Sequence, residues 1–188
     1  MTVDEIFANM TAHMVKGFML HQDLANYYDF LNLHGFKRCH EYHYFCESIS
    51  HRRLYRYYVN HYNKLVPYQD IRSEDVIPES WYRYTRQDVD ANTKKNAVKS
   101  GVEQWVKWEQ ATKAQYQEWY KELLDMGEVA AAMEISQYIS DADDELKRAQ
   151  RKHMELASVG YDLAYIGQMQ DALHDKYKAK MECLVVAA

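Results

Sequence analysis

Residues that break regular structure are scarce, because the 188-residue chain holds only six glycines and two prolines. An all-β protein needs a turn about every ten residues, and glycine and proline supply many of those turns. Apolar residues instead recur at alternating steps of three and four, which places them along one face of a helix. The sequence therefore excludes an all-β fold and favours long helices around one core.

Four long segments carry such an apolar seam and predict a four-helix bundle in a single domain, residues 1–188. Thr2 and Glu5 match a capping box that starts the first helix. We expect helix ends at Gly35, Gly127 and Gly160, since glycine accepts the left-handed backbone there. The predicted helices cover about 3–33, 37–65, 92–125, 129–159 and, as a shorter C-terminal helix, 162–183.

The segment 66–91 holds both prolines, Pro67 and Pro78, and no sustained apolar period. At roughly 3.3 Å per extended residue it is long enough to run beside a helix of about 45 Å. We therefore predict one long crossover between the second and third helices, with a short helical turn around Trp81.

Composition limits the classes of partner and compartment. A net charge of −5 gives no basic excess, so we expect no nucleic-acid partner. The three cysteines, Cys39, Cys46 and Cys183, form no CxxC pair and favour a reducing compartment over a disulfide framework. The N-terminus lacks a signal-peptide pattern, and no apolar run approaches about 18 residues. The expected setting is cytoplasmic, without a membrane partner.

Polar residues interrupt the apolar seams near the middle of the bundle. At about 1.5 Å per residue from the first turn, His21, Glu47 and His51 lie within about one helical turn of one level, and Glu109 reaches it from the third helix. Buried carboxylates and imidazoles need partners, which convergence supplies directly or through a cation. Two carboxylates and two histidines suit iron, manganese or zinc. The predicted metal ligands are Glu47, His51, Glu109 and His21.

A second interpretation of these residues needs no metal. They can form a structural polar network that only fixes how the helices align. The fourth helix adds no seam carboxylate at this level, because the seam residue is Ala142, between Asp141 and Asp143.

The other histidines are expected to have ordinary roles. His40 and His153 also interrupt seams, and we expect both to be hydrogen-bonded core residues. The basic and aromatic run 52–58 places its arginines on an exposed helix face, which argues against RNA stacking. The histidines expected in solvent are His13, His43 and His61.

The second helix carries the run Glu47-Ser48-Ile49-Ser50-His51, which is followed by Asn60 and then by Gln69-Asp70-Ile71. This pattern resembles that of the ferritins. In ferritins a Glu-Glu-x-x-His helix is followed, at similar spacings, by Asn and by a Gln-Asp-Ile that opens the long crossover. The resemblance implies an all-α, ferritin-like four-helix bundle with one long crossover and a short C-terminal helix.

The third and fourth helices extend the resemblance over nearly the whole chain in architecture. Glu109 falls where ferritins have a metal-binding glutamate, and Tyr138–Asp141, with Gly160 beyond, is similar to the ferritin helix that ends in glycine. The resemblance implies iron binding and O₂-linked oxidation, with tyrosines such as Tyr44 as redox or hydrogen-bonding groups. Because ferritins form closed shells, it also raises the expectation of a homo-oligomer.

Three positions depart from the ferritin pattern and imply a remodelled or lost metal centre. Ser48 replaces the bridging glutamate, the stretch 13–17 of the first helix has no glutamate, and the fourth helix has Ala142. Two functions therefore stand beside each other: a bundle with a non-standard metal site, and a metal-free structural or protein-interaction bundle. The sequence does not decide whether the chain is an enzyme.

Overall fold

The computed structural model describes residues 1–67 and 89–187. These described residues form five helices and are 88% helical. The described residues contain no strand, which confirms the all-α prediction. The helices are α1 (Val3–Phe30), α2 (His34–Tyr62), α3 (Ala91–Asp125), α4 (Val129–Ser158) and α5 (Leu163–Ala187).

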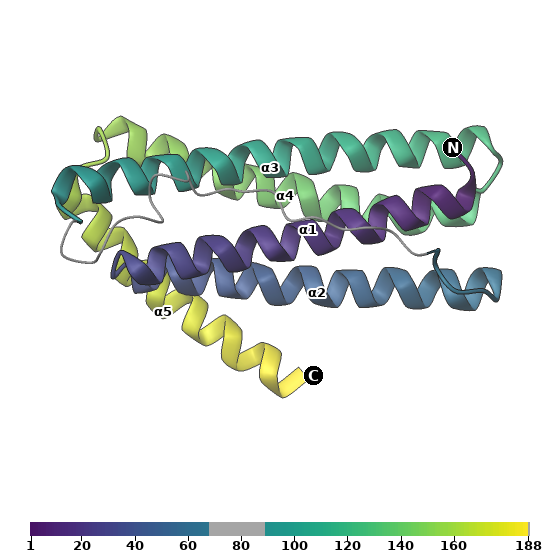
Figure 1. Ribbon diagram of the computed structural model, residues 1–188, viewed down its shortest axis with the longest axis horizontal. Helices are drawn as coiled ribbons and strands as arrows, with labels where there is room; N and C mark the ends of the chain where they lie inside the picture. The colour runs from purple at the N-terminus through teal and green to yellow at the C-terminus, as the bar shows by residue number, and fades with distance from the viewer. Residues whose placement is uncertain (68–88, 188) are drawn as a thin grey trace.

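The first four helices form two antiparallel pairs, α1 with α2 and α3 with α4, packed side by side as a bundle (Figure 1). The last helix, α5, starts at the end of α4 and packs against α2. The end of α2 and the start of α3 lie at opposite ends of the bundle, as a long crossover requires (Figure 1). The predicted turn around Trp81 and the Gln69–Ile71 motif lie outside the described residues.

Two of the helix starts, those of α1 and α3, and two of the helix ends have side-chain caps or glycines that the sequence signals. The Thr2 N–H donates to Glu5 Oε2 at 2.8 Å and the Glu5 N–H donates to Thr2 Oγ1 at 3.2 Å, so the predicted capping box is present. Asp90 caps α3 by accepting from the Thr93 N–H at 2.7 Å. Gly127 and Gly160 adopt φ values of +80° and +60° at the predicted turns.

The predicted end of the first helix at Gly35 is wrong. Asn32 provides the left-handed residue, with φ of +57°, and Gly35 lies inside the first turn of α2. Asparagine tolerates this conformation better than most residues because its side chain bonds locally. The glycine has another reason to be there: a Cβ at Gly35 would lie 1.8 Å from the backbone oxygen of Gln170 on α5.

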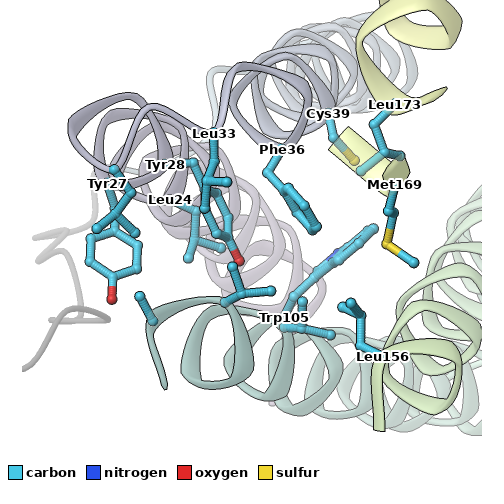
Figure 2. Packing of buried hydrophobic residues seen from close by; sticks show 14 of the residues in the cluster. Leu24, Tyr27, Tyr28, Leu33, Phe36, Cys39, Trp105, Leu156, Met169 and Leu173 are labelled. Atoms are coloured by element: carbon cyan, nitrogen blue, oxygen red, sulfur yellow. The ribbon is translucent and has the colours of Figure 1, made fainter. Parts of the chain in front are cut away.

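Two apolar clusters fill the bundle, one toward each end. The first surrounds Trp105 and Tyr28 and includes apolar residues of α5 (Figure 2). The second surrounds Phe7, Leu123 and Ile135. Between them, at mid-length, lie residues that we call the polar belt: His21, His40, His43, Glu47, Glu109 and Glu145.

Candidate functional site

Part of the polar belt is a continuous chain of short polar contacts. The Nδ1 atoms of His21 and His40 are 3.0 Å apart, and His21 Nε2 lies 3.5 Å from Glu109 Oε1. Trp105 donates its indole N–H to the same oxygen at 3.1 Å. Burial lowers the pKa of both imidazoles, so the two rings are neutral and one Nδ1 must donate to the other. A neutral imidazole has one N–H, and that of His21 is on Nε2, facing Glu109. His21 Nδ1 therefore accepts, and His40 Nδ1 donates to it.

The rest of the belt opens onto a cavity of about 340 Å³, which we call the carboxylate pocket. Glu47 of α2, Glu109 of α3 and Glu145 of α4 all line it. A Cβ on Gly17 would lie 3.5 Å from the Glu47 carboxyl carbon and 3.5 Å from the Trp108 ring, so this carboxyl lies against α1. Carboxylates from three helices therefore face one space, with further lining from Thr112, Tyr116, Tyr138 and Asp141.

Burial raises the pKa of the carboxyl groups of Glu47, Glu109 and Glu145. Burial raises the pKa of Glu47 to about 8, and the charge of Glu109 adds to the effect. Burial also raises the pKa of Glu109 to about 8, against the Trp105 hydrogen bond, which lowers it. The pKa of Glu145 rises to about 7 through burial, although Arg148 lowers it. Glu109 is 2% exposed, whereas Glu47 and Glu145 are only partly buried.

The four predicted ligands are only partly brought together. Glu47 and Glu109 line the pocket, and His21 contacts Glu109 rather than the cavity. His51 is one helical turn beyond Glu47 but does not line the pocket, and its ring packs against Phe18, 6.4 Å between centroids. Within the described residues, no three carboxyl, imidazole or thiol groups are placed so as to hold one ion.

Three members of the belt, His40, His43 and Glu145, were not among the predicted ligands, and the last two line the carboxylate pocket. His43 was expected in solvent, and this is wrong: it is 2% exposed, with Nδ1 3.1 Å from Glu145 Oε2. Among the described residues, His43 Nε2 has no hydrogen-bond partner. A signal was present, because His43 precedes Glu47 by four residues and so shares its helix face. Glu145 lies beside the seam residue Leu146 and reaches inward from the edge of the α4 face.

The remaining histidines divide between the two expectations. His40 is buried in the chain described above, as expected of a hydrogen-bonded core residue. His153 bonds the Tyr161 hydroxyl at 2.8 Å as expected, but it is only half-buried, so the expectation that it lies in the core is wrong. His61 is exposed, as predicted. His13 is not free in solvent: it stacks on Trp108 with centroids 4.7 Å apart, and its Nε2 is 2.9 Å from Thr112 Oγ1.

The raised carboxyl pKa values predict how stability depends on pH. Glu47 and Glu109 ionise near pH 4.3 when unfolded but near pH 8 when folded, so their contribution is present below about pH 4.3 and is lost as pH rises to about 8. The buried histidines have lowered pKa values and act oppositely, losing stability as pH falls below about 6.5.

We therefore expect the metal-free protein to be most stable near pH 6. Its free energy of unfolding should fall by about 1–3 kcal/mol between pH 6.5 and 8.5, because the loss of the carboxyl contribution dominates over that range. Urea denaturation in the presence of chelator measures this directly. A flat profile over that range would show that the carboxyl groups are solvated in the folded protein.

Comparisons with known proteins support the fold alone. No protein-family model and no curated protein matches the chain. Among solved structures, a humanized archaeal ferritin is similar with a TM-score of 0.76 and 15% identity, over 91% of this chain and 94% of that one. An open-pore ferritin from the hyperthermophilic archaeon Archaeoglobus fulgidus is similar with a TM-score of 0.70 and 15% identity, over 90% and 93%. The protein thus has a ferritin-like fold, the architecture that the sequence resemblance predicted.

Proposed function

We propose that this ferritin-like bundle binds a divalent transition-metal ion, iron, manganese or zinc, in the carboxylate pocket. Glu47 and Glu109 are the proposed ligands, and Glu145 is added to them as a third carboxylate. The observation that carries the proposal is the cluster itself: three carboxyl groups from three helices face one cavity, and their pKa values are raised. A cation at this position would offset both the burial and the mutual repulsion of the ionised groups.

The residues around the pocket fit such an ion in donor chemistry, although the side chains must move to meet it. Both contacts of Glu109 use Oε1, which leaves Oε2 without a hydrogen bond to any described residue. The unpaired His43 Nε2 offers one more nitrogen ligand. Both ring nitrogens of His21 are engaged, so we assign it the role of orienting Glu109. His51 joins the ligands only if its ring leaves Phe18.

Iron, when bound, would supply one-electron redox chemistry. The chain's own part is to hold the ion, to release the carboxyl protons when the ion binds, and to limit water through the aromatic lining of Tyr116 and Tyr138. Self-association and a cytoplasmic location stay predictions. Across the described residues, none of the helices combines the length and apolar character needed to cross a membrane.

A metal-free polar network is the second candidate function of the same residues. The chain from His40 through His21 to Glu109 and Trp105 favours it, because every link is made without an ion. A protein of this kind would use the fold for structure or for interaction with another protein. The two candidates differ in what a metal does to stability.

Metal titration of untagged, chelator-treated protein separates these candidates. At about one hundred times its Kd, a bound ion adds about 2.7 kcal/mol, which raises Tm by roughly 5–10 °C in a domain of this size. We expect this shift with anaerobic Fe²⁺, Mn²⁺ or Zn²⁺, accompanied by proton release near pH 7. An unchanged Tm with all three ions would reject the metal site and leave the polar network.

A further inference from the structure

A second, smaller cavity lies between α2, α3, α4 and α5. Its volume is about 150 Å³, and its floor is apolar and aromatic. Figure 2 shows Phe36, Cys39, Trp105 and Leu173 pointing toward the interior from α2, α3 and α5. We call this cavity the cationic pocket because of the side chains at its rim.

The rim carries four positively charged residues and one acid. Arg148 is paired with Glu145, and Lys152 is paired with Glu155 at 2.9 Å. Arg151 and Lys176 also line the cavity, and neither makes an ion pair with any described residue. The pocket therefore has excess positive charge in a protein whose net charge is −5.

The pKa values of the ionisable side chains around the pocket are consistent with an excess of positive charge there. The pKa of Lys176 is lowered by burial and by the neighbouring Lys180, so its ammonium is not balanced by acids around it. The floor adds no negative charge, because burial raises the pKa of the Cys39 thiol to about 12 and also raises that of the Tyr177 hydroxyl. The one acid that lines the pocket, Glu155, is paired with Lys152.

We propose that the cationic pocket binds a small organic carboxylate with an aromatic or compact apolar body. The body would pack on Phe36 and Trp105, and the carboxylate would pair with Arg151 and Lys176 at the rim. Arginine presents parallel N–H donors that match a carboxylate, and lysine adds a second positive charge. The site is distinct from the carboxylate pocket and requires no metal.

The size of the cavity selects among anions. A dry cavity of about 150 Å³ holds one benzene-sized ring, so a nucleotide is too large. Inorganic phosphate would satisfy the rim but leave the apolar floor empty. Benzoate combines a ring of the right size with one negative charge, which makes it a suitable probe for calorimetry and saturation-transfer NMR.

The test uses metal-free, full-length protein with benzoate, acetate and benzyl alcohol. We expect benzoate to bind saturably at one site and at least about tenfold more tightly than either other probe, because only benzoate uses both rim and floor. The double variant Arg151→Gln, Lys176→Gln should weaken benzoate at least about tenfold, the effect of losing charged hydrogen bonds. Tm should not fall, since the variant relieves repulsion between cations.

A matched control removes two positive charges elsewhere on the same helices. Lys147→Gln, Lys178→Gln should keep benzoate affinity within about twofold of wild type, because neither residue lines the pocket. Arg148 is left intact because it also lines the carboxylate pocket and pairs with Glu145 there. The result is therefore independent of whether the protein binds metal.

Three outcomes would overturn the proposal. They are the absence of saturable benzoate binding at high concentration, binding of acetate as tight as that of benzoate, and equally tight binding of benzyl alcohol with no effect of the double variant. Absence of saturable binding means that no site exists. Equal binding of acetate indicates a simple ion site, and equal binding of benzyl alcohol indicates an apolar cavity that does not recognise charge.

Discussion

Replacing Glu109 with glutamine should abolish the metal-dependent rise in Tm. In the absence of metal, the same variant should be more stable at high pH, relative to wild type, than it is at low pH. Glutamine keeps an oxygen to accept from the Trp105 indole but cannot ionise. Because the pKa of Glu109 is raised to about 8, wild type loses stability between pH 6 and 8.5 that the variant retains. The difference in free energy of unfolding should move by about 1–3 kcal/mol toward the variant over that range.

The two halves of this result separate the two candidate functions. A metal site predicts both the loss of metal stabilisation and the shift with pH, whereas a polar network predicts the pH shift alone. The matched control is Glu118→Gln on the same helix, an exposed glutamate that bonds Gln115 at 3.1 Å. It should reproduce neither effect. If Glu109→Gln still shows the full metal-dependent rise in Tm, Glu109 is not a ligand.

Replacing Gly35 with alanine should destabilise the protein by about 2–4 kcal/mol, because overpacking against fixed backbone costs more than filling flexible space. The new Cβ would meet the Gln170 backbone oxygen at 1.8 Å, so α2 and α5 must separate. The tyrosines Tyr42 and Tyr177, whose rings are 5.4 Å apart across this contact, would separate too. Urea denaturation and hydrogen exchange of the α5 amides measure the loss.

Gly167→Ala on α5 is the control for this change. Nothing lies within 4 Å of a Cβ at Gly167, and the residue is helical, so alanine there should be neutral or stabilise by about 0.5–1 kcal/mol. Equal effects of the two substitutions would mean that α5 is not docked against Gly35. Loss of α5 protection in Gly35→Ala alone would show that this glycine permits the docking.

Periodicity along the chain was sufficient to predict most of the fold. The spacing of apolar residues depends on the local geometry of each helix, so it correctly indicated the four long helices and the shorter α5. Glu109 was predicted to be buried from its seam position alone, and it is. The turn at Asn32 was missed because both asparagine and glycine accept left-handed backbone, and the choice between neighbouring positions is made by packing.

The candidate site was predicted less completely, and His43 shows why. His43 lies off the predicted seam, yet it shares a helix face with Glu47 and contacts the Trp105 ring of α3, with centroids 5.2 Å apart. The Tyr177 ring of α5, 5.9 Å away, completes its burial, and the sequence of α2 does not show that α5 docks there. Glu145 was missed for a related reason, since its reach into the pocket depends on how α4 is rotated against its neighbours.

The sequence by itself determined the helices, the long crossover topology and the presence of polar residues at mid-bundle, because each depends on residue spacing along one chain. Only the tertiary structure decided which of those residues share a cavity. It brought Glu47 and Glu109 together with Glu145, placed His51 against Phe18, and turned both nitrogens of His21 to partners. Such convergence depends on helix rotation and on the docking of α5, which involve contacts between residues far apart in sequence.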